Sequence, residues 1–290
     1  MPETVFAWGP GMHMFVGMTA LSKIALISPV IRALLDKYPE EFLYGAVVPD
    51  VVVGKKYAGY MHHCHNWDIG RLILSEAKTA GQRAAAYGYL THLAADIVAH
   101  NYYIPFKIIK SFGARMLSHT YWEMRFDLGV PEKAWKQVDK VSTYKMREFD
   151  RLLERVLKKT IFSYRTNKRI FSSILIFQKM RGMRRSLKLY ERTSRWEMGE
   201  ENRQHYVDLT IEAALGFLKD PKGAACLEID PTGEARMTYA KTLRRRIRIL
   251  MRRGLLSKKA VDTLMALVKE RLAVGLYRPN LVLPDVTDVL

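Results

Sequence analysis

Hydrophobic and polar positions repeat with the period of a helix along most of the chain. Apolar residues recur three and four positions apart, which is typical of amphipathic helices, and the period-two alternation of half-buried strands is weak throughout. The pattern therefore predicts an all-α protein. The expected helices lie at residues 13–35, 71–80, 82–104, 117–128, 132–159, 203–219, 235–253 and 257–274.

Proline and glycine set the expected breaks between these helices. Pro29 interrupts the first helix, and Pro105 ends the helix at 82–104, because proline cannot continue the backbone hydrogen bonding. Pro49 biases Val48 away from helical angles, so we expect Asp50 at a turn or a helix start. The segment 132–159 is one basic amphipathic helix or a pair of helices.

Two turn signals suggest how the chain is divided. DPKG at 220–223 and DPTG at 230–233 combine proline and glycine in the manner of tight turns. We predict a helical domain over residues 1–220 and a basic helical extension over residues 221–290.

The charge is unevenly distributed between the two halves. Residues 1–131 hold 12 Lys+Arg against 10 Asp+Glu, a net of +2, whereas residues 132–290 hold 35 against 19, a net of +16. Such a surface is attracted to phosphate in a membrane or a nucleic acid, although an ordinary solvated face is the simpler interpretation of any single basic run, including Arg244–Arg253. The apolar run at 170–177 is too short to span a bilayer and is either core or a membrane-seeking patch.

Cysteine content and segment hydropathy suggest an intracellular protein. With only Cys64 and Cys226, no disulfide framework is indicated. No run of 18 apolar residues is present, and the first residues make a poor signal peptide. We expect a cytoplasmic location, including a peripheral position on the inner membrane face.

The stretch 89–100, YLTHLAADIVAH, carries a row of metal-binding residue types. On a helix His92, Asp96 and His100 lie at i, i+4 and i+8 and share one face. His92 and His100 are separated by about 12 Å of helix rise, too far to share one ion comfortably. Asp96 lies between them, and because a carboxylate can bridge two metals, the row predicts a metal cluster.

Other histidines and carboxylates recur at similar spacings. His119 and Glu123 repeat the i, i+4 pairing, and three histidines lie in MHHCHNWD at 61–68. We interpret His62, His63 and His205 as ordinary surface or supporting histidines. Four aromatic residues either line a substrate cleft or, as their helical spacing favours, belong to the core: Trp67, Tyr102, Tyr103 and Trp122.

The order of these motifs resembles a known family. The elements Trp8-x4-His13, Pro49-Asp50, His65-x-Trp67-Asp68, His92-x3-Asp96-x3-His100 and His119-x3-Glu123 together resemble the zinc-dependent phospholipases C and the related S1/P1-type nucleases. The resemblance implies a multi-helix bundle that holds two or three zinc ions. The basic extension has no counterpart in it.

The resemblance assigns three sets of zinc ligands. The first set comprises Asp50, His65, His92 and Asp96. The second comprises His119, Glu123 and a histidine that is His100, His62 or His63. The third comprises His13, the bridging Asp96 and main-chain groups of Trp8, which is internal here, so that only its carbonyl is available without processing.

The implied chemistry is phosphodiester hydrolysis at two or three metals, with Asp50 orienting or deprotonating the attacking water. Our leading hypothesis is a phospholipase C-type enzyme that acts on a headgroup at an anionic membrane. The alternatives are a nuclease, which a basic surface serves equally well, and a non-catalytic, metal-stabilised membrane-binding protein. The sequence does not indicate an oligomeric state.

Overall fold

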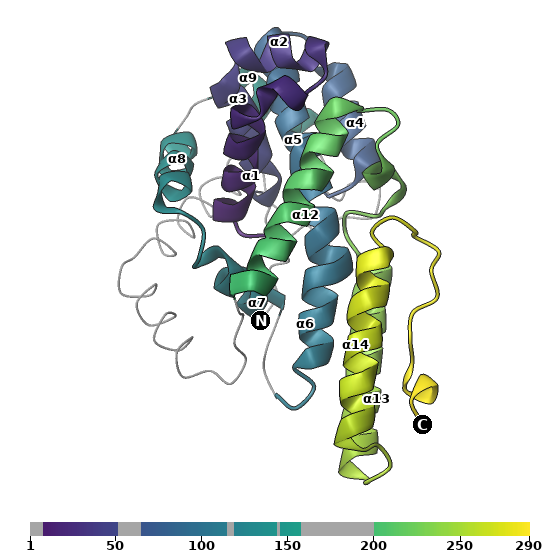
Figure 1. The fold of residues 1–290 in the computed structure, drawn as a ribbon. Coiled ribbons are helices and arrows are strands. Elements are labelled where there is room, and N and C mark those ends of the chain that lie inside the picture. The colour runs from purple at the N-terminus through teal and green to yellow at the C-terminus, as the bar shows by residue number, and fades with distance from the viewer. Residues whose placement is uncertain (1–7, 52–64, 115–118, 144–145, 158–199) are drawn as a thin grey trace.

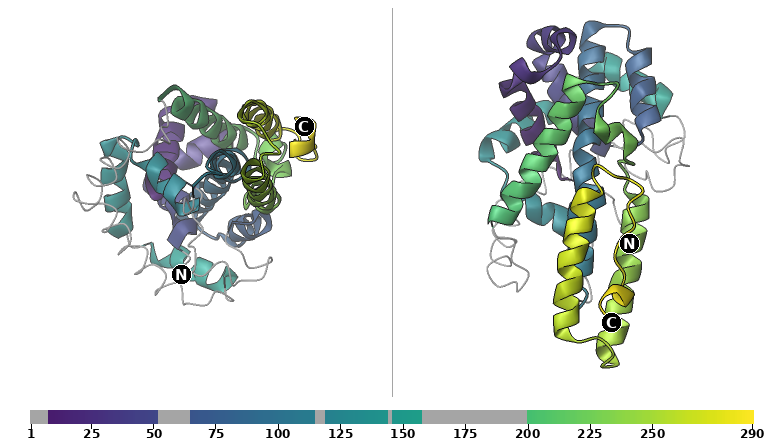
Figure 2. Two further views of the ribbon diagram at one scale, coloured as in Figure 1. Left: turned by 90° about the horizontal axis from the view of Figure 1, so that it is seen from below. Right: turned by 45° about the vertical axis from the view of Figure 1, so that its right-hand side comes forward.

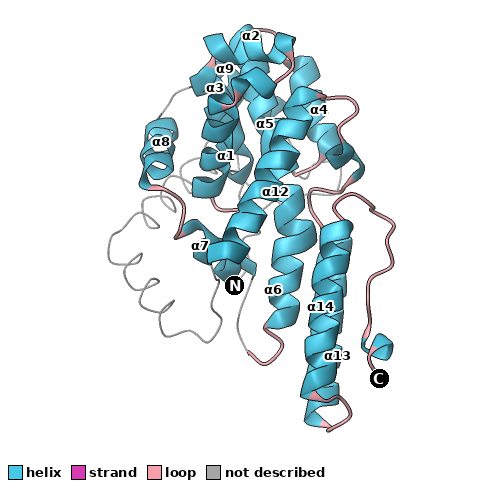
Figure 3. Cartoon of the chain, in the orientation of Figure 1, coloured by secondary structure: helices cyan, strands magenta, loops and turns pink. Residues whose placement is uncertain are grey.

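A computed structural model describes residues 8–51, 65–114, 119–143, 146–157 and 200–290 of the chain (Figure 1). Helices make up all the regular structure in these ranges, where no strand occurs (Figure 3), so the all-α prediction is confirmed. Within the same ranges no helix is both long and apolar enough to cross a membrane. The apolar run at 170–177 lies outside the described residues.

The helix α5 (Ala80–Val98) lies at the centre of the bundle. A capping box starts it: the Thr79 hydroxyl accepts the Gln82 N–H, and the Gln82 side chain accepts the Thr79 N–H. Its residues are buried on nearly every side, because other helices surround it (Figure 2). Those that pack on it most extensively are α3 (Pro39–Val47), α4 (Trp67–Glu76) and α12 (Glu200–Lys219).

The central helix does not end at Pro105, contrary to prediction. It continues through a π-helical turn, η5 (Ala99–Tyr103), into α6 (Ile104–Lys110), with Pro105 in the first turn of α6. The wider π turn accommodates a proline that would clash with the preceding turn of a regular α-helix. The result is one continuous helical rod from α5 to α6 (Figure 1).

The N-terminal part is broken at Pro29, as predicted. It forms α1 (Pro10–Ser22), η1 (Ile24–Leu26) and α2 (Pro29–Lys37). After α3 the chain forms a 3₁₀ turn, η2 (Val48–Val51), which carries Asp50. The expectation for Val48 was wrong, because this residue has helical angles (φ −63°, ψ −28°) despite preceding Pro49. Val48 is buried, and its packing in the core outweighs the local steric preference.

Three shorter helices pack against different members of the bundle. They are α7 (His119–Asp127), α8 (Glu132–Thr143) and α9 (Arg147–Val156), so the segment from 132 is a pair of helices.

The C-terminal residues form a long helical hairpin. After η6 (Ala225–Glu228), α13 (Glu234–Arg252) and α14 (Lys258–Val274) run beside α6 and project beyond its end, and η7 (Val286–Asp288) follows (Figures 1 and 2). Both long helices pack on α6. The division of the chain at residue 220 stays a prediction.

Candidate metal centre

Five buried side chains from separate parts of the chain converge beside α5. Each is at most 1% exposed. His92 and Asp96 lie on α5. His13 lies on α1, Asp50 lies on η2, and His65 directly precedes the N-cap of α4. The structure thus brings together the whole first ligand set and the histidine of the third.

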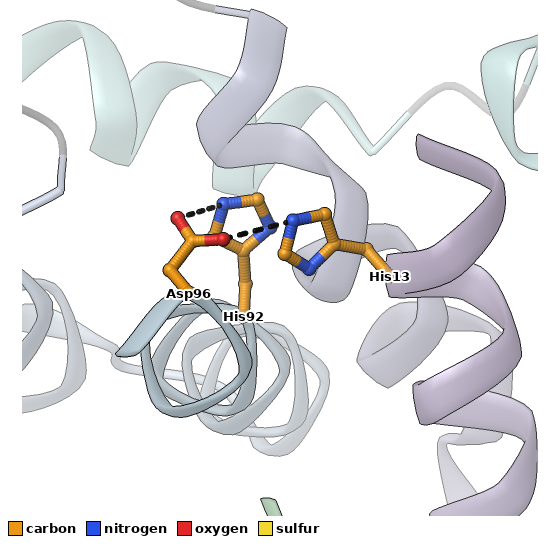
Figure 4. Close-up of side chains that lie close together, drawn as sticks. All are labelled: His13, His92 and Asp96. Atoms are coloured by element: carbon orange, nitrogen blue, oxygen red, sulfur yellow. Dashed lines mark ion pairs between the residues drawn. The ribbon is translucent and has the colours of Figure 1, made fainter. Parts of the chain in front are cut away.

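Asp96 lies at the centre of this cluster. Its Oδ1 atom is 3.1 Å from His13 Nε2. Figure 4 draws this ion pair. Its Oδ2 atom is 3.0 Å from His65 Nε2 and 3.2 Å from His92 Nε2. The two carboxylate oxygens therefore face different histidines, which is the arrangement that a bridging carboxylate requires.

Asp50 lies on the other side of the same three imidazoles. Its Oδ1 atom is 3.6 Å from His65 Nε2 and 3.7 Å from His92 Nε2, and its Oδ2 atom is 3.9 Å from His13 Nε2. Two carboxylates thus flank three ring nitrogens in a buried space.

The tautomer of His92 is set by the main chain of α3. His92 Nδ1 lies 2.9 Å from the Ala46 carbonyl oxygen, which can only accept, so Nδ1 carries the proton and Nε2 presents its lone pair to the cluster. There it meets His65 Nε2 at 3.1 Å. Two ring nitrogens approach this closely only with a proton or a cation between them. A hydrogen bond from the other ring nitrogen to a carbonyl, like the one from His92 Nδ1 to Ala46, commonly orients histidines that bind metal.

The donor set fits zinc. Two triads of ligand atoms each lie within 4.8 Å of one another. One triad is His13, His92 and Asp96, and the other is Asp50, His65 and His92. Among the described atoms, neither Asp96 oxygen and neither His13 ring nitrogen makes a hydrogen bond of acceptable geometry, although they are close together. Imidazole nitrogens and carboxylate oxygens are the ligands that zinc takes besides cysteine.

The electrostatics keep both α5 side chains in the forms that bind metal. Burial raises the pKa of Asp96, but His92, His13 and His65 together outweigh burial and hold this pKa well below its usual value. Burial lowers the pKa of His92, and His13 lowers it further. At neutral pH the site therefore presents a carboxylate and a neutral imidazole.

His100 lies at the edge of the cluster, in the π-helical turn. Its ring centroid is 6.3 Å from that of His65. Its Nδ1 donates to the Pro231 carbonyl at 2.6 Å, and the neighbouring Asn101 amide donates to the Asp230 carbonyl at 2.8 Å. The turn at 230–233 therefore orients His100, so that its Nε2 carries the lone pair.

The remaining members of the second and third ligand sets stay predictions. Glu123 is buried on α7, whereas the His119 side chain, like His62 and His63, lies outside the described residues. The indole of Trp8 donates to the Ala95 carbonyl at 3.0 Å and stacks on Tyr103. This packing places the Trp8 ring in the core.

The four aromatic residues considered for a cleft are buried in the core, as their spacing favoured. Trp67, for example, donates its indole N–H to the Ile229 carbonyl at 2.8 Å. His205 is exposed at the surface and packs against Tyr102. Cys226 is buried, and burial raises the pKa of its thiol to about 12.

Asp127 is a site residue that the sequence analysis missed. Its buried carboxylate accepts the backbone N–H groups of Gly11 and Met12 in the first turn of α1, the turn that also carries His13. Burial raises the pKa of Asp127 to about 7, although these hydrogen bonds lower it. A signal existed, because Asp127 follows Glu123 by four residues, the spacing that drew attention to Asp96 and His100.

Lys107 is a second residue that the sequence did not single out. It is buried on α6, with its ammonium 5.7 Å from the ring centroid of Tyr103 and 5.4 Å from that of Trp122. Burial, with further contributions from Lys110 and Arg125, lowers the pKa of Lys107 to about 7.

Comparison with known proteins identifies a family. The model of a family described as zinc-dependent phospholipase C matches residues 12–171, just over half of the chain. No curated protein and no solved structure matches the chain.

Proposed function

The chain belongs to the zinc-dependent phospholipase C family, and from this premise we propose that it hydrolyses the phosphodiester of a phospholipid headgroup. The observation that carries the proposal is the buried cluster of three imidazoles and two carboxylates beside α5. A structural role alone would not require five polar side chains to converge in the core, because burying such groups is costly unless each is satisfied.

In this proposal the cluster would hold more than one zinc ion. Asp50, His65, His92 and Asp96 would form the first ligand set, and His13 with Asp96 would contribute to a neighbouring site. The opposite directions of the two Asp96 oxygens support this assignment. His119 and Glu123 with His100 remain the proposed second set.

Zinc in such a site supplies a Lewis acid and lowers the pKa of water toward about 7. The protein supplies the rest. The Ala46 carbonyl keeps the His92 ring in one tautomer, and Asp96 adds negative charge between three imidazoles. Asp50 is the proposed base, because its carboxylate faces the same three ring nitrogens from the other side at 3.6–3.9 Å.

A direct test measures metal and turnover together. Protein purified without added metal is expected to contain more than one zinc per chain and to release phosphorylated headgroup from phosphatidylcholine. Asp50→Asn should reduce turnover at least about a thousandfold, as loss of a metal-site base does. Asp36→Asn, an exposed change on α2, is the matched control and should leave turnover unaltered. The proposal is contradicted if the purified protein contains no zinc and added zinc does not change its turnover.

The same experiment with single-stranded DNA as a second substrate separates the two alternatives. A nuclease is favoured by the net charge of +16 over residues 132–290 and would cleave single-stranded DNA in preference to phospholipid. A non-catalytic, metal-stabilised membrane protein would hold zinc but hydrolyse neither substrate.

A further inference from the structure

The helical hairpin of α13 and α14 carries a block of positive charge with no acidic residue within it. Between Glu234 and Asp262 the sequence holds 10 Lys+Arg and no Asp or Glu. Three of these arginines have structural contacts: Arg236 donates to the Pro279 carbonyl at 3.0 Å, Arg244 donates to the Ala114 carbonyl at 2.6 Å, and Arg246 forms an ion pair with Asp285. The exposed cations other than Arg246 are Lys241, Arg245, Arg252, Arg253, Lys258 and Lys259.

The tip of the hairpin combines these cations with exposed apolar side chains. Leu255 is 59% exposed at the turn, and Ile249 is 38% exposed one turn before the end of α13. Gly254 adopts φ 68°, a left-handed angle that suits glycine, and Leu256 anchors the turn in the core. The tip is therefore an ordered turn that presents a leucine to solvent between basic residues.

A groove next to the tip also combines apolar and positively charged residues. It encloses about 490 Å³ between α6 and the hairpin. Its apolar lining includes Phe106, Phe112, Met251, Val261 and Met265, and its charged residues are Lys110, Lys258, Lys269 and a single acid, Asp262. An apolar floor with a mainly cationic rim suits an amphiphile whose head is anionic.

A second groove on the molecule shows the contrast. It has a volume of about 620 Å³ and includes Leu26, which is 57% exposed. Its charges are balanced, with Lys23 and Lys219 beside Asp208 and Glu212. The combination of exposed leucine and net positive charge is thus a property of the hairpin and not of every groove on this basic protein.

We propose that the hairpin tip and its adjoining groove are a docking surface for an anionic phospholipid bilayer. The exposed cations would contact lipid phosphates while Leu255 enters the apolar boundary, the pairing that interfacial binding requires. Segment 158–199 is disfavoured as the occupant because it holds 12 Lys+Arg against 2 Asp+Glu, and a second copy would bring like charges together. Docking does not depend on the proposed hydrolysis.

Sedimentation with vesicles tests the surface in the full-length protein. We expect binding to vesicles of phosphatidylglycerol and phosphatidylcholine in equal parts, little binding to pure phosphatidylcholine, and release by added salt. Arg252→Gln/Arg253→Gln/Lys258→Gln/Lys259→Gln should weaken binding at least about tenfold. The matched control removes four exposed charges elsewhere, Arg32→Gln/Lys37→Gln/Lys133→Gln/Lys136→Gln, and should change it less than about twofold, because distant charges are screened.

A matched pair of leucine substitutions tests the apolar contribution to vesicle binding. Leu255→Ser should weaken vesicle binding several-fold, whereas Leu26→Ser, at a position of similar exposure in the charge-balanced groove, should not. If the fourfold variant does not fold, this pair and the salt dependence decide the question. Equal losses in tip and control variants, equal affinity for pure phosphatidylcholine, or tighter binding of single-stranded RNA that the tip variant abolishes would each overturn the proposal.

Discussion

The carboxylate of Asp127 accepts the backbone N–H of Gly11 at 3.1 Å, although the two residues are 116 positions apart in the chain. This hydrogen bond, with the one to Met12, ties the end of α7 to the start of α1. A carboxylate at a helix N-terminus satisfies N–H groups that have no partner within the helix. Asp127 therefore positions the helix that carries His13.

Asp127→Asn should alter how stability depends on pH. The pKa of Asp127 is about 7 in the folded protein and near 4 in the unfolded protein. The protonated side chain therefore contributes to the free energy of unfolding fully below about pH 4, and this contribution is lost as the pH rises through 7. The variant cannot ionise, so it should gain stability relative to the wild type over this window, by at most about 4 kcal/mol. Urea unfolding of metal-free protein between pH 4 and 8 measures the difference.

The exposed substitution Asp36→Asn serves as the control and should not reproduce this trend. A constant difference between Asp127→Asn and wild type across the pH range would show that Asp127 does not titrate there.

Removing metal should destabilise the protein in steps. Because zinc bound only to the folded state stabilises it by mass action, a chelator should lower the melting temperature, with more than one step if several ions are bound. Asp96→Asn should be the most damaging single ligand change, since the Asp96 oxygens face His13 on one side and His65 and His92 on the other. Elemental analysis and thermal melting measure both effects; full zinc content in Asp96→Asn would rule out the bridging role.

Gly88→Ala should destabilise the protein by several kcal/mol. A Cβ at Gly88 would lie 2.0 Å from the Phe42 carbonyl oxygen, so α3 and α5 would have to separate. The same helix contact brings the Ala46 carbonyl to His92, so zinc content should fall as well. Gly216→Ala in α12 is the control, because open space surrounds that position and alanine should stabilise the helix by about 0.5–1 kcal/mol. Chemical unfolding of both variants provides the comparison.

Lys107→Met should stabilise the protein at neutral and acid pH. Burial lowers the pKa of Lys107 to about 7. The buried charge therefore destabilises the folded protein fully below about pH 7, and this destabilisation disappears as the pH rises from 7 toward the unfolded pKa near 10.5. Methionine fills a similar volume without a charge, and its advantage should fade over that window. Unfolding at pH 6 and pH 10 tests this, with the exposed Lys133→Met as the control; a gain that is the same at both values would contradict it.

Local patterns in the sequence determined the all-α class, the approximate positions of most helices other than α3, and the row of His92, Asp96 and His100. These follow from the sequence because helical periodicity and i, i+4 spacing depend only on neighbours within a few residues. The ordered motifs likewise identified the family. The same local rules failed at Val48 and Pro105, where core packing and a π-helical turn outweighed the preferences of proline.

The tertiary structure alone decided which distant residues meet. His13, Asp50 and His65 come from three elements, and only the packing of α1, α3 and α4 around α5 brings their side chains to Asp96. The role of Asp127 at the start of α1 and the burial of Lys107 depend on such packing too. Spacing along one helix shows which residues share a face, whereas convergence between helices is set by how close their surfaces approach, as at Gly88.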